Sequence, residues 1–289
     1  MPSTQALKGR IRSVKNTKQI TKAMQLVAAS KMRKAQEATK ASAPYTQAAT
    51  EMLTKLSQRE SVKDHALFVQ RPVATRLLIV IASDKGLAGA YNSNIMKLYA
   101  KQLTDDDAAG IKNTTITIGR RASQFVARLK DTEVLGAYED LPDRPGGREF
   151  HAILDSAKSL FENGTVDAVD VIYTDFISSV NQQASIMRVL PAGFETAAVE
   201  DVPSEVVYEP SASRVLDGIA YRLVGAQIFQ ALLDARASEH SMRMMAMKNA
   251  TDNASDLIDD LTLEMNKARQ GAITQELAEI SGGVEALNE

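Results

Sequence analysis

The chain has 289 residues, of which 44% are hydrophobic and 24% are charged, and its formal net charge is −2. This is the composition of a folded protein large enough for more than one structural unit, without a general attraction for polyanions. Cysteine is absent, which excludes disulfides, thiolate zinc sites and cysteine nucleophiles, and no apolar run is long enough for a membrane span or a secretory signal.

Residues 4 to about 57 are predicted to form a long helix. Their apolar residues recur at intervals of three or four, and the pattern drifts between registers as in coiled coils with stutters. Pro44 is expected to kink or interrupt the helix, because proline lacks the amide hydrogen that a helix interior needs. The predicted apolar stripe comprises Leu7, Ile11, Val14, Ile20, Met24, Val27, Ala35, Ala38, Tyr45, Ala49, Met52 and Leu56.

The first forty residues are strongly basic, and Glu37 is their only acidic residue. A basic helix of this kind could bind nucleic acid, an anionic membrane surface or acidic protein partners. Its positive residues surround the apolar stripe instead of forming one row, and the chain has no tryptophan anchor. These features favour acidic protein partners, while nucleic-acid binding stays open as an alternative that salt-sensitive DNA retention would reveal.

Residues 74 to 209 have the pattern of an α/β domain. Apolar runs that predict strands alternate with amphipathic runs that predict helices, which is typical of a largely parallel sheet. The predicted strands are 76–82, 114–119, 170–176 and 184–190, with an edge strand at 205–208. The predicted helices are 93–103, 121–130 and 149–162. We therefore expect a Rossmann-like α/β domain inserted between two long helices.

A turn-rich loop, residues 83–92, follows the first predicted strand. Open α/β sheets bind ligands at this end of their strands, so the loop is the main candidate for a nucleotide or small-molecule site. Its glycines, Gly86 and Gly89, form G-x-x-G and lack the patterns of known phosphate-binding loops. The competing interpretation is a tight, exposed turn that contacts another protein.

Histidines and acidic clusters do not form a recognisable site. The three histidines, His65, His151 and His240, have no second histidine at metal-ligand spacing, so we expect no metal site. The aspartates at 105–107 and 259–260 are expected to be solvated, the former in a polar loop and the latter on a helix surface. No serine-nucleophile motif is present, so we expect neither a catalytic site nor a cofactor.

Residues 211 to 288 are predicted to form a second, longer helix that contains no proline. At about 1.5 Å per residue it would be on the order of 110 Å long. Apolar residues alternate at intervals of three and four along it, as in the seam of a coiled coil. Because its outer half is acidic, we expect antiparallel pairing with the basic N-terminal helix. The seam comprises Leu216, Ile219, Leu223, Ala226, Leu233, Ala237, Met244, Met247, Ala254, Ile258, Leu261, Met265, Ala268 and Ala272.

Several segments resemble one known family. Residues 12–36, RSVKNTKQITKAMQLVAASKMRKAQ, resemble the N-terminal helix of the gamma subunit of F-type ATP synthases. The loop 83–92, SDKGLAGAYN, resembles that family's loop after the first strand, with Ala88 and Ala90 in place of a cysteine and a glycine. Residues 237–254 and 266–283 resemble its C-terminal helix, and the order of parts agrees along the whole chain.

This resemblance implies a mechanical role. The paired helices would form a rotating shaft inside a ring of three alpha and three beta subunits. The α/β domain would lie at its foot, on the epsilon subunit and the membrane-embedded c-ring. The complex would translocate protons across a bacterial cell membrane. This chain would be attached peripherally, at the cytoplasmic face of that membrane. Nucleotides would bind to the alpha and beta subunits, and this chain would have no catalytic site.

The resemblance also implies contact residues. Contacts with the beta subunits are implied for Arg243, Arg269, Gln270, Thr274, Met24, Lys8 and Arg10. Contacts with the c-ring or epsilon are implied for Tyr208 and Glu209. Each shaft residue could instead be solvated or belong to the coil itself, and Met24 also fits the seam. Gly271 stands where the family usually has alanine, and we expect it to soften the helix locally.

Overall fold

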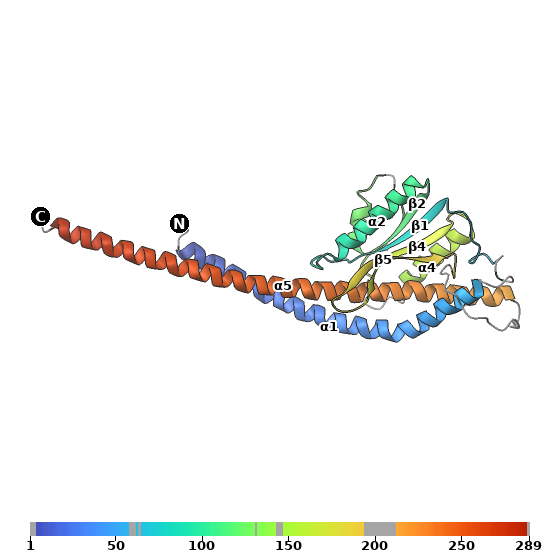
Figure 1. The fold of residues 1–289 in the computed structure, drawn as a ribbon, viewed down its shortest axis with the longest axis horizontal. Coiled ribbons are helices and arrows are strands. Elements are labelled where there is room, and N and C mark those ends of the chain that lie inside the picture. Colours follow the sequence, from blue (N-terminus) through green and yellow to red (C-terminus); the bar gives the residue numbers. More distant parts are fainter. Residues whose placement is uncertain are drawn as a thin grey trace. The chain divides into compact units, whose positions relative to one another are not determined.

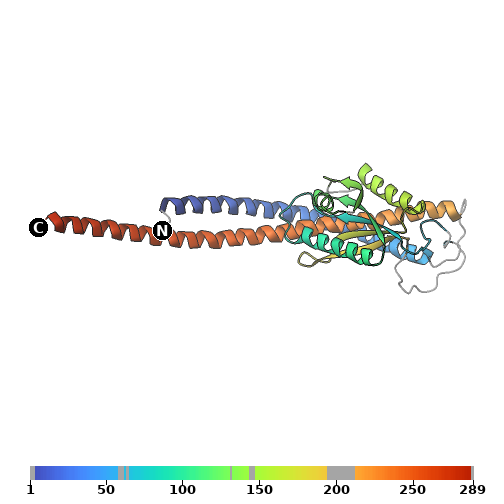
Figure 2. The same ribbon diagram turned by 90° about the horizontal axis from the view of Figure 1, so that it is seen from above.

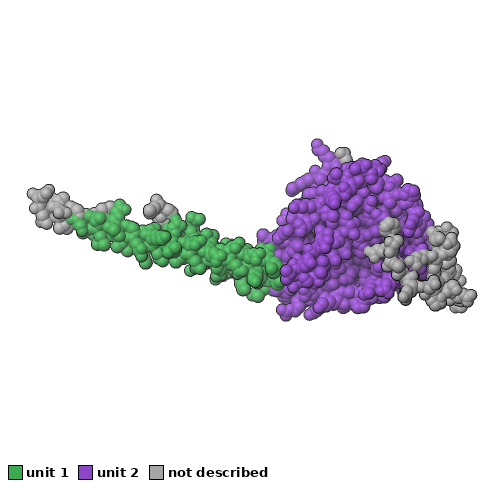
Figure 3. Space-filling view, in the orientation of Figure 1, with its two compact units in different colours: residues 1–28, 243–289 green, residues 29–242 purple. Residues whose placement is uncertain are grey.

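The chain folds into two compact units, which are shown as a computed structural model in Figures 1 and 3. The structure describes residues 4–57, 62, 65–130, 132–142, 147–193 and 212–287. Unit 1 consists of residues 1–28 and 243–289, and unit 2 of residues 29–242. Two long helices, α1 (Thr4–Ser57) and α5 (Ala212–Leu287), contribute to both units.

Unit 2 contains a five-stranded sheet in the order β3-β2-β1-β4-β5 (Figure 1). Its strands are β1 (Thr75–Ile81), β2 (Lys112–Ile118), β3 (Glu133–Tyr138), β4 (Ala168–Phe176) and β5 (Gln182–Leu190). The first four strands are parallel, and β5 is antiparallel to β4. Strands β1 and β4 are buried on both faces, which explains why they are nearly continuous apolar runs.

Helices cover both faces of the sheet. The crossover helices are α2 (Tyr91–Ala108), α3 (Arg120–Val126) and α4 (Arg148–Glu162). Leu78 and Val80 of β1 belong to the apolar core formed with α2 and α3. The alternate residues Leu77, Ile79 and Ile81 belong to the core on the other face, with α4, α1 and α5. The expected fold, an α/β domain between two long paired helices, is confirmed.

Two features of unit 2 differ from the sequence prediction. Strand β3 has no predicted counterpart, because its side chains are largely exposed at the sheet edge and do not form an apolar run. Helix α2 continues to Ala108, so Asp106 lies on a helix and not in a polar loop. Its side chain is buried, with only 2% of the residue exposed, so solvation of this aspartate is a wrong expectation. The predicted strand at 205–208 lies outside the described residues.

Asp106 is buried because it belongs to an ion-pair network under α2. Arg76 of β1 places its Nε 3.0 Å from Asp106 Oδ2 and also pairs with Asp170 of β4. Arg188 of β5 pairs with the same aspartate, and its Nη2 donates to Asp170 Oδ2 at 3.1 Å. Two arginines thus compensate two carboxylates, and the network connects three strands with α2.

The two long helices pair antiparallel in unit 1. Near the start of α1, Leu7 packs against Leu261 of α5 in one apolar cluster. Further along α1, Thr21 accepts a hydrogen bond of 2.8 Å from the hydroxyl of Thr251. Residue numbers rise along one helix as they fall along the other, so the predicted antiparallel coil is confirmed.

The buried side of α1 differs from the predicted stripe. Ile20 and Val27 are 60% and 59% exposed, whereas Thr21 and Ala28 are buried. Buried or half-buried residues recur in a strict alternation of three and four, and residues such as Met24, Ala38 and Thr54 flank this series. The series is Leu7, Ile11, Val14, Lys18, Thr21, Gln25, Ala28, Met32, Ala35, Thr39, Ser42, Thr46, Ala49, Leu53 and Leu56. The predicted drift is therefore wrong: the helix keeps one heptad register, and polar seam residues conceal it.

Pro44 does not interrupt α1, which is continuous from Thr4 to Ser57. Figure 1 shows instead that the second half of this helix is bent. A bend is the expected effect of a proline inside a helix, because its ring clashes with the carbonyl group one turn earlier.

Gly271 lies on an exposed part of α5, and a Cβ built there would meet no atom within 4 Å. We therefore expect Gly271→Ala to stabilise this part of the helix by about 1 kcal/mol, because alanine loses less backbone entropy. Amide hydrogen exchange in the surrounding turns should slow by a factor of about five. The matched variant Ala272→Gly should speed exchange by a similar factor. Equal exchange rates in all three proteins would contradict a local softening at Gly271.

Candidate functional site

All the shaft residues singled out by the sequence belong to unit 1. The exposed ones are Lys8, Arg10, Arg269, Gln270 and Thr274, and the half-buried ones are Met24 and Arg243. The Thr274 hydroxyl donates a hydrogen bond of 3.0 Å to the Gln270 carbonyl of its own helix. Their roles as contacts stay predictions, because the structure holds one chain alone. Tyr208 and Glu209 lie outside the described residues.

The last described turns of α5 have no helical partner. Figures 1 and 2 show this end of α5, in red, extending past the start of α1. Ile273, Leu277 and Ile280 form an apolar stripe along it, and they are 50%, 60% and 65% exposed. Arg269 and Gln270 begin the same stretch. Three large apolar side chains in a row on an exposed helix are typical of a surface that another molecule covers.

The loop after β1 is shaped by hydrogen bonds of its own. The Ser83 amide donates to Asn92 Oδ1 at 3.1 Å, and the buried Ser83 hydroxyl lies 2.7 Å from the Lys85 carbonyl oxygen. Gly89 has a φ of 57°, in the left-handed region that favours glycine. At Gly86 a Cβ would lie 2.7 Å from a guanidinium nitrogen of Arg121. Turn geometry therefore explains Gly89 without a bound phosphate, whereas at Gly86 only the flexible end of the Arg121 side chain would have to shift.

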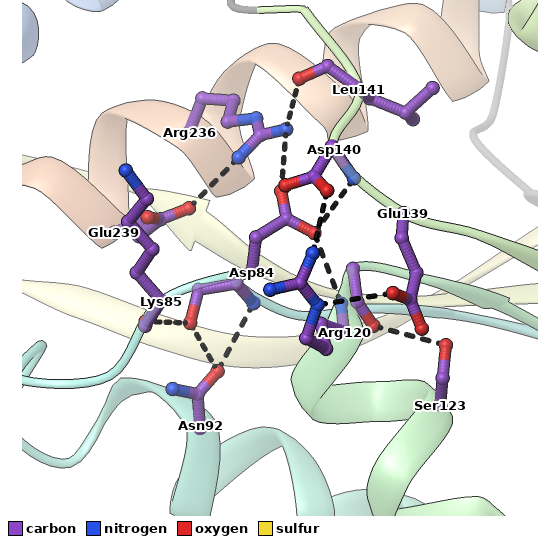
Figure 4. Close-up of polar contacts among 12 residues, drawn as sticks. Asp84, Lys85, Asn92, Arg120, Ser123, Glu139, Asp140, Leu141, Arg236 and Glu239 are labelled. Atoms are coloured by element: carbon purple, nitrogen blue, oxygen red, sulfur yellow. Dashed lines mark hydrogen bonds and ion pairs between the residues drawn. The ribbon is translucent and has the colours of Figure 1, made fainter.

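Asp84, in this loop, ties three strand ends together (Figure 4). Its Oδ1 accepts hydrogen bonds from the backbone amides of Arg120, after β2, and Asp140, after β3, at 3.1 and 3.0 Å. Its Oδ2 lies 3.6 Å from Nη2 of Arg236 on α5. One carboxylate thus links the carboxyl ends of β1, β2 and β3 with the long helix.

Arg236 is held by more than Asp84 (Figure 4). Its Nη2 donates to the Leu141 carbonyl oxygen at 2.9 Å, and its Nη1 donates to Glu239 Oε2 at 3.2 Å. The side chains of Arg236 and Glu239 are largely buried. The carboxylates of Glu139 and Asp140 hold Arg120 nearby and raise its pKa, first through the hydrogen bond that Arg120 Nε donates to Glu139 Oε2. These residues form an ion-pair joint between the loop after β1 and α5, and their charged groups pair with one another.

Asp234 is a second buried carboxylate on α5 within unit 2. Burial, with a smaller contribution from the charge of Asp175 on β4, raises its pKa to about 7 against the lowering effect of the hydrogen bond from Gln230. Gln230 Nε2 donates to the two carboxylate oxygens at 3.1 and 3.3 Å. This aspartate carries a proton at pH values where most aspartates are ionised.

Sequence reasoning missed this joint. Asp84 and Arg236 are far apart in the chain, and neither belongs to a pattern that predicts an ion pair. Only the strand order that brings the loop beside α5 makes them neighbours.

Within the described part of the chain, no helix is long and apolar enough to span a bilayer.

Known proteins resemble this chain along its whole length. A family model described as ATP synthase matches residues 3–287. The ATP synthase gamma chain of Opitutus terrae is 41% identical over 295 residues and covers 97% of each chain. That of Stenotrophomonas maltophilia is 38% identical over 288 residues, covering 99% of this chain and 100% of its own.

Solved structures share the fold at lower sequence identity. A chain of the Euglena gracilis mitochondrial ATP synthase, described as OSCP/F1/c-ring, superimposes with a TM-score of 0.67 at 18% identity, covering 98% of this chain and 94% of its own. A rotor structure from the same organism gives a TM-score of 0.65 at 16% identity, with coverage of 93% and 98%. These two structures support the fold alone.

Proposed function

Because the chain belongs to the family of ATP synthase gamma chains, we propose that it is the central shaft of a proton-translocating F-type ATP synthase. In this role it transmits torque between a membrane c-ring and a ring of three alpha and three beta subunits. It is a non-catalytic subunit, and nucleotides bind to the other chains. The observation that carries the proposal is α5, which pairs with α1 and then continues as a single exposed helix with an apolar stripe.

A two-helix coil suits torque transmission. Side chains packed along the seam couple the two helices, so the pair resists twisting better than one helix would. Its surface is asymmetric, because exposed Ile20 and Val27 lie on α1 while exposed aspartates lie on α5. As the shaft turns, each beta subunit meets a different surface, and differential contact shifts its equilibrium between conformations.

The proposed contacts follow from chemistry and from the family resemblance. The proposed beta-subunit contacts are Arg243, Arg269, Gln270, Thr274, Met24, Lys8 and Arg10. Arginine offers a planar fork that binds carboxylates through two hydrogen bonds. Tyr208 and Glu209 are proposed to contact the c-ring or epsilon. The chain would then lie at the cytoplasmic face of the cell membrane and be held there through the complex.

Reconstitution tests the proposal. The purified chain, added to alpha and beta subunits, should support their ATP turnover, and alone it should hydrolyse no ATP. Arg269→Ala combined with Gln270→Ala should lower coupled turnover by roughly ten-fold or more, the effect of losing a charged hydrogen-bonded contact. The control Lys101→Ala removes an exposed charge from α2 and should leave turnover unchanged. A wild-type chain that supports no turnover would refute the shaft, and a fully active double variant would refute these two contacts.

A further inference from the structure

We propose that α5 is held in unit 2 by a polar collar that fixes its rotation about its own axis, and that torque passes through this collar between the sheet and the helix. The collar has two sides. Side A is Arg236 and Glu239 with Asp84 and the Leu141 carbonyl, and side B is Ser238 and Ser241 with Thr174, Ser179 and Gln182. The inference rests on the shaft function proposed above and assigns residues that position the helix.

Side B joins α5 to β4 and to the turn between β4 and β5. Ser238 Oγ donates to the Thr174 carbonyl oxygen at 3.3 Å, and Ser241 Oγ donates to the Ser179 carbonyl oxygen at 2.6 Å. Gln182 Nε2 of β5 donates to Ser241 Oγ at 3.3 Å. Side A joins the same helix to the ends of β1 and β3, as Figure 4 shows. Strands β1, β3 and β4 are therefore connected to a short stretch of α5, and β2 is connected to the loop that contains Asp84.

The two sides hold α5 from different directions. Successive residues of an α-helix are rotated by about 100°, so Ser238 and Ser241 point about 200° and 140° away from Arg236. A helix held by hydrogen bonds on two nearly opposite sides cannot turn without breaking one set of them. Apolar packing alone has no preferred direction and resists such rotation less.

The composition of residues 238–241 also supports a polar collar. Ser238, Glu239, His240 and Ser241 are four consecutive buried polar residues. Burial of polar side chains costs free energy unless partners are supplied, so a helix that only had to pack would carry apolar residues here. The stretch ends next to Met242, the last residue of unit 2, where α5 passes into unit 1. The collar thus fixes the helix at the point where rotation must be passed on.

Single-molecule rotation measures the collar directly. The chain has no cysteine, so Lys101→Cys attaches a probe to exposed α2 at one defined site. In a complex whose alpha and beta subunits are fixed to a surface, the angular variance of the probe at each pause reports torsional stiffness. Ser238→Ala with Ser241→Ala removes side B, one of two supports that act in parallel, so the variance should rise by a factor of about two. The ATP hydrolysis rate should stay at the wild-type value.

Further variants separate a collar from a general loss of stability. Asp84→Asn, Arg236→Met and Glu239→Gln together remove side A and should raise the variance as side B removal does. Thr117→Val removes a buried hydroxyl of β2 that contacts Ser123 and does not touch α5. It should lower the melting temperature without changing the variance. If a multiple variant fails to fold, Ser241→Ala alone is measured and should give a smaller increase.

The outcomes are distinguishable from those for the shaft itself. If the wild-type chain rotates with its complex and the collar variants keep the wild-type variance, the collar is refuted and the shaft function stands. An equal increase in Thr117→Val would also refute it, because general loosening would then explain the effect. A wild-type chain that neither assembles nor rotates refutes the shaft function.

Discussion

Asp170→Ala is expected to lower the free energy of unfolding by about 3–5 kcal/mol, the usual cost of removing one partner from a buried ion pair. Asp170 is buried and serves both Arg76 and Arg188. Its removal takes the shared carboxylate from two guanidinium groups that are themselves largely buried. Asp106 still compensates Arg76, so Arg188 loses more. Urea denaturation of the isolated chain, followed by circular dichroism, measures the change.

Two further variants show how much of the lost stability comes from the burial and the charge of Asp170. Asp107→Ala removes an exposed carboxylate one residue after Asp106 and should change stability by less than about 0.5 kcal/mol. Asp170→Asn keeps the hydrogen-bond acceptor but loses the charge, so its effect should lie between the two. A loss below about 1 kcal/mol for Asp170→Ala would mean that the arginines turn to water and that the network contributes little.

Asp234→Asn is expected to stabilise the chain at pH 8 by up to about 4 kcal/mol, the equivalent of the full pKa shift at 1.36 kcal/mol per unit. The folded-state pKa is raised from 3.8 to about 7, chiefly by burial. The folded chain therefore binds this proton more tightly than the unfolded chain. Wild-type stability should fall as the pH rises from about 4 to about 7 and then level off. Asparagine keeps the shape of the side chain and has no proton to lose.

Thermal melts at pH 4, 6 and 8 test this expectation. The variant and the wild type should melt alike near pH 4, where both side chains are neutral, and diverge as the pH rises. Asp175→Asn removes the neighbouring charge but not the burial, so its gain at pH 8 should be smaller. If Asp234→Asn is instead less stable than the wild type at pH 8, the carboxylate is charged and well compensated there.

The elements with strong periodicity could be predicted from the sequence. Strands β1 and β4 are central and apolar on both faces, and the seam of α5 is apolar over most of its length. Strand β3 could not be found in this way, because an exposed edge strand has no apolar run. The heptad of α1 was concealed for a related reason: Lys18, Thr21 and Gln25 occupy seam positions with polar side chains.

The site was less accessible to sequence reasoning than the fold. The contact residues of the shaft, such as Arg269, came from a family resemblance, and they stay predictions until partners are present. The collar around Arg236 and Ser241 depends on which strand ends lie beside α5. Asp106 shows the same limit, since an aspartate in a run of three acids looks solvated until Arg76 is placed next to it. Pairings between distant segments follow from topology, which short patterns do not contain.

The hydrogen bond between Thr21 and Thr251 has a consequence for how far the single end of α5 protrudes. Sliding one helix along the other by a heptad would move it by about 10 Å. It would also place Thr21 opposite Met244 or Ile258 and break the hydrogen bond between the helices, at a net cost of about 1 kcal/mol, because each hydroxyl still reaches a carbonyl oxygen of its own helix, that of Lys18 or Met247. The heptad repeat alone tolerates such a slip, whereas a polar pair at one seam position disfavours it. The pair of threonines therefore favours one axial reach of the shaft.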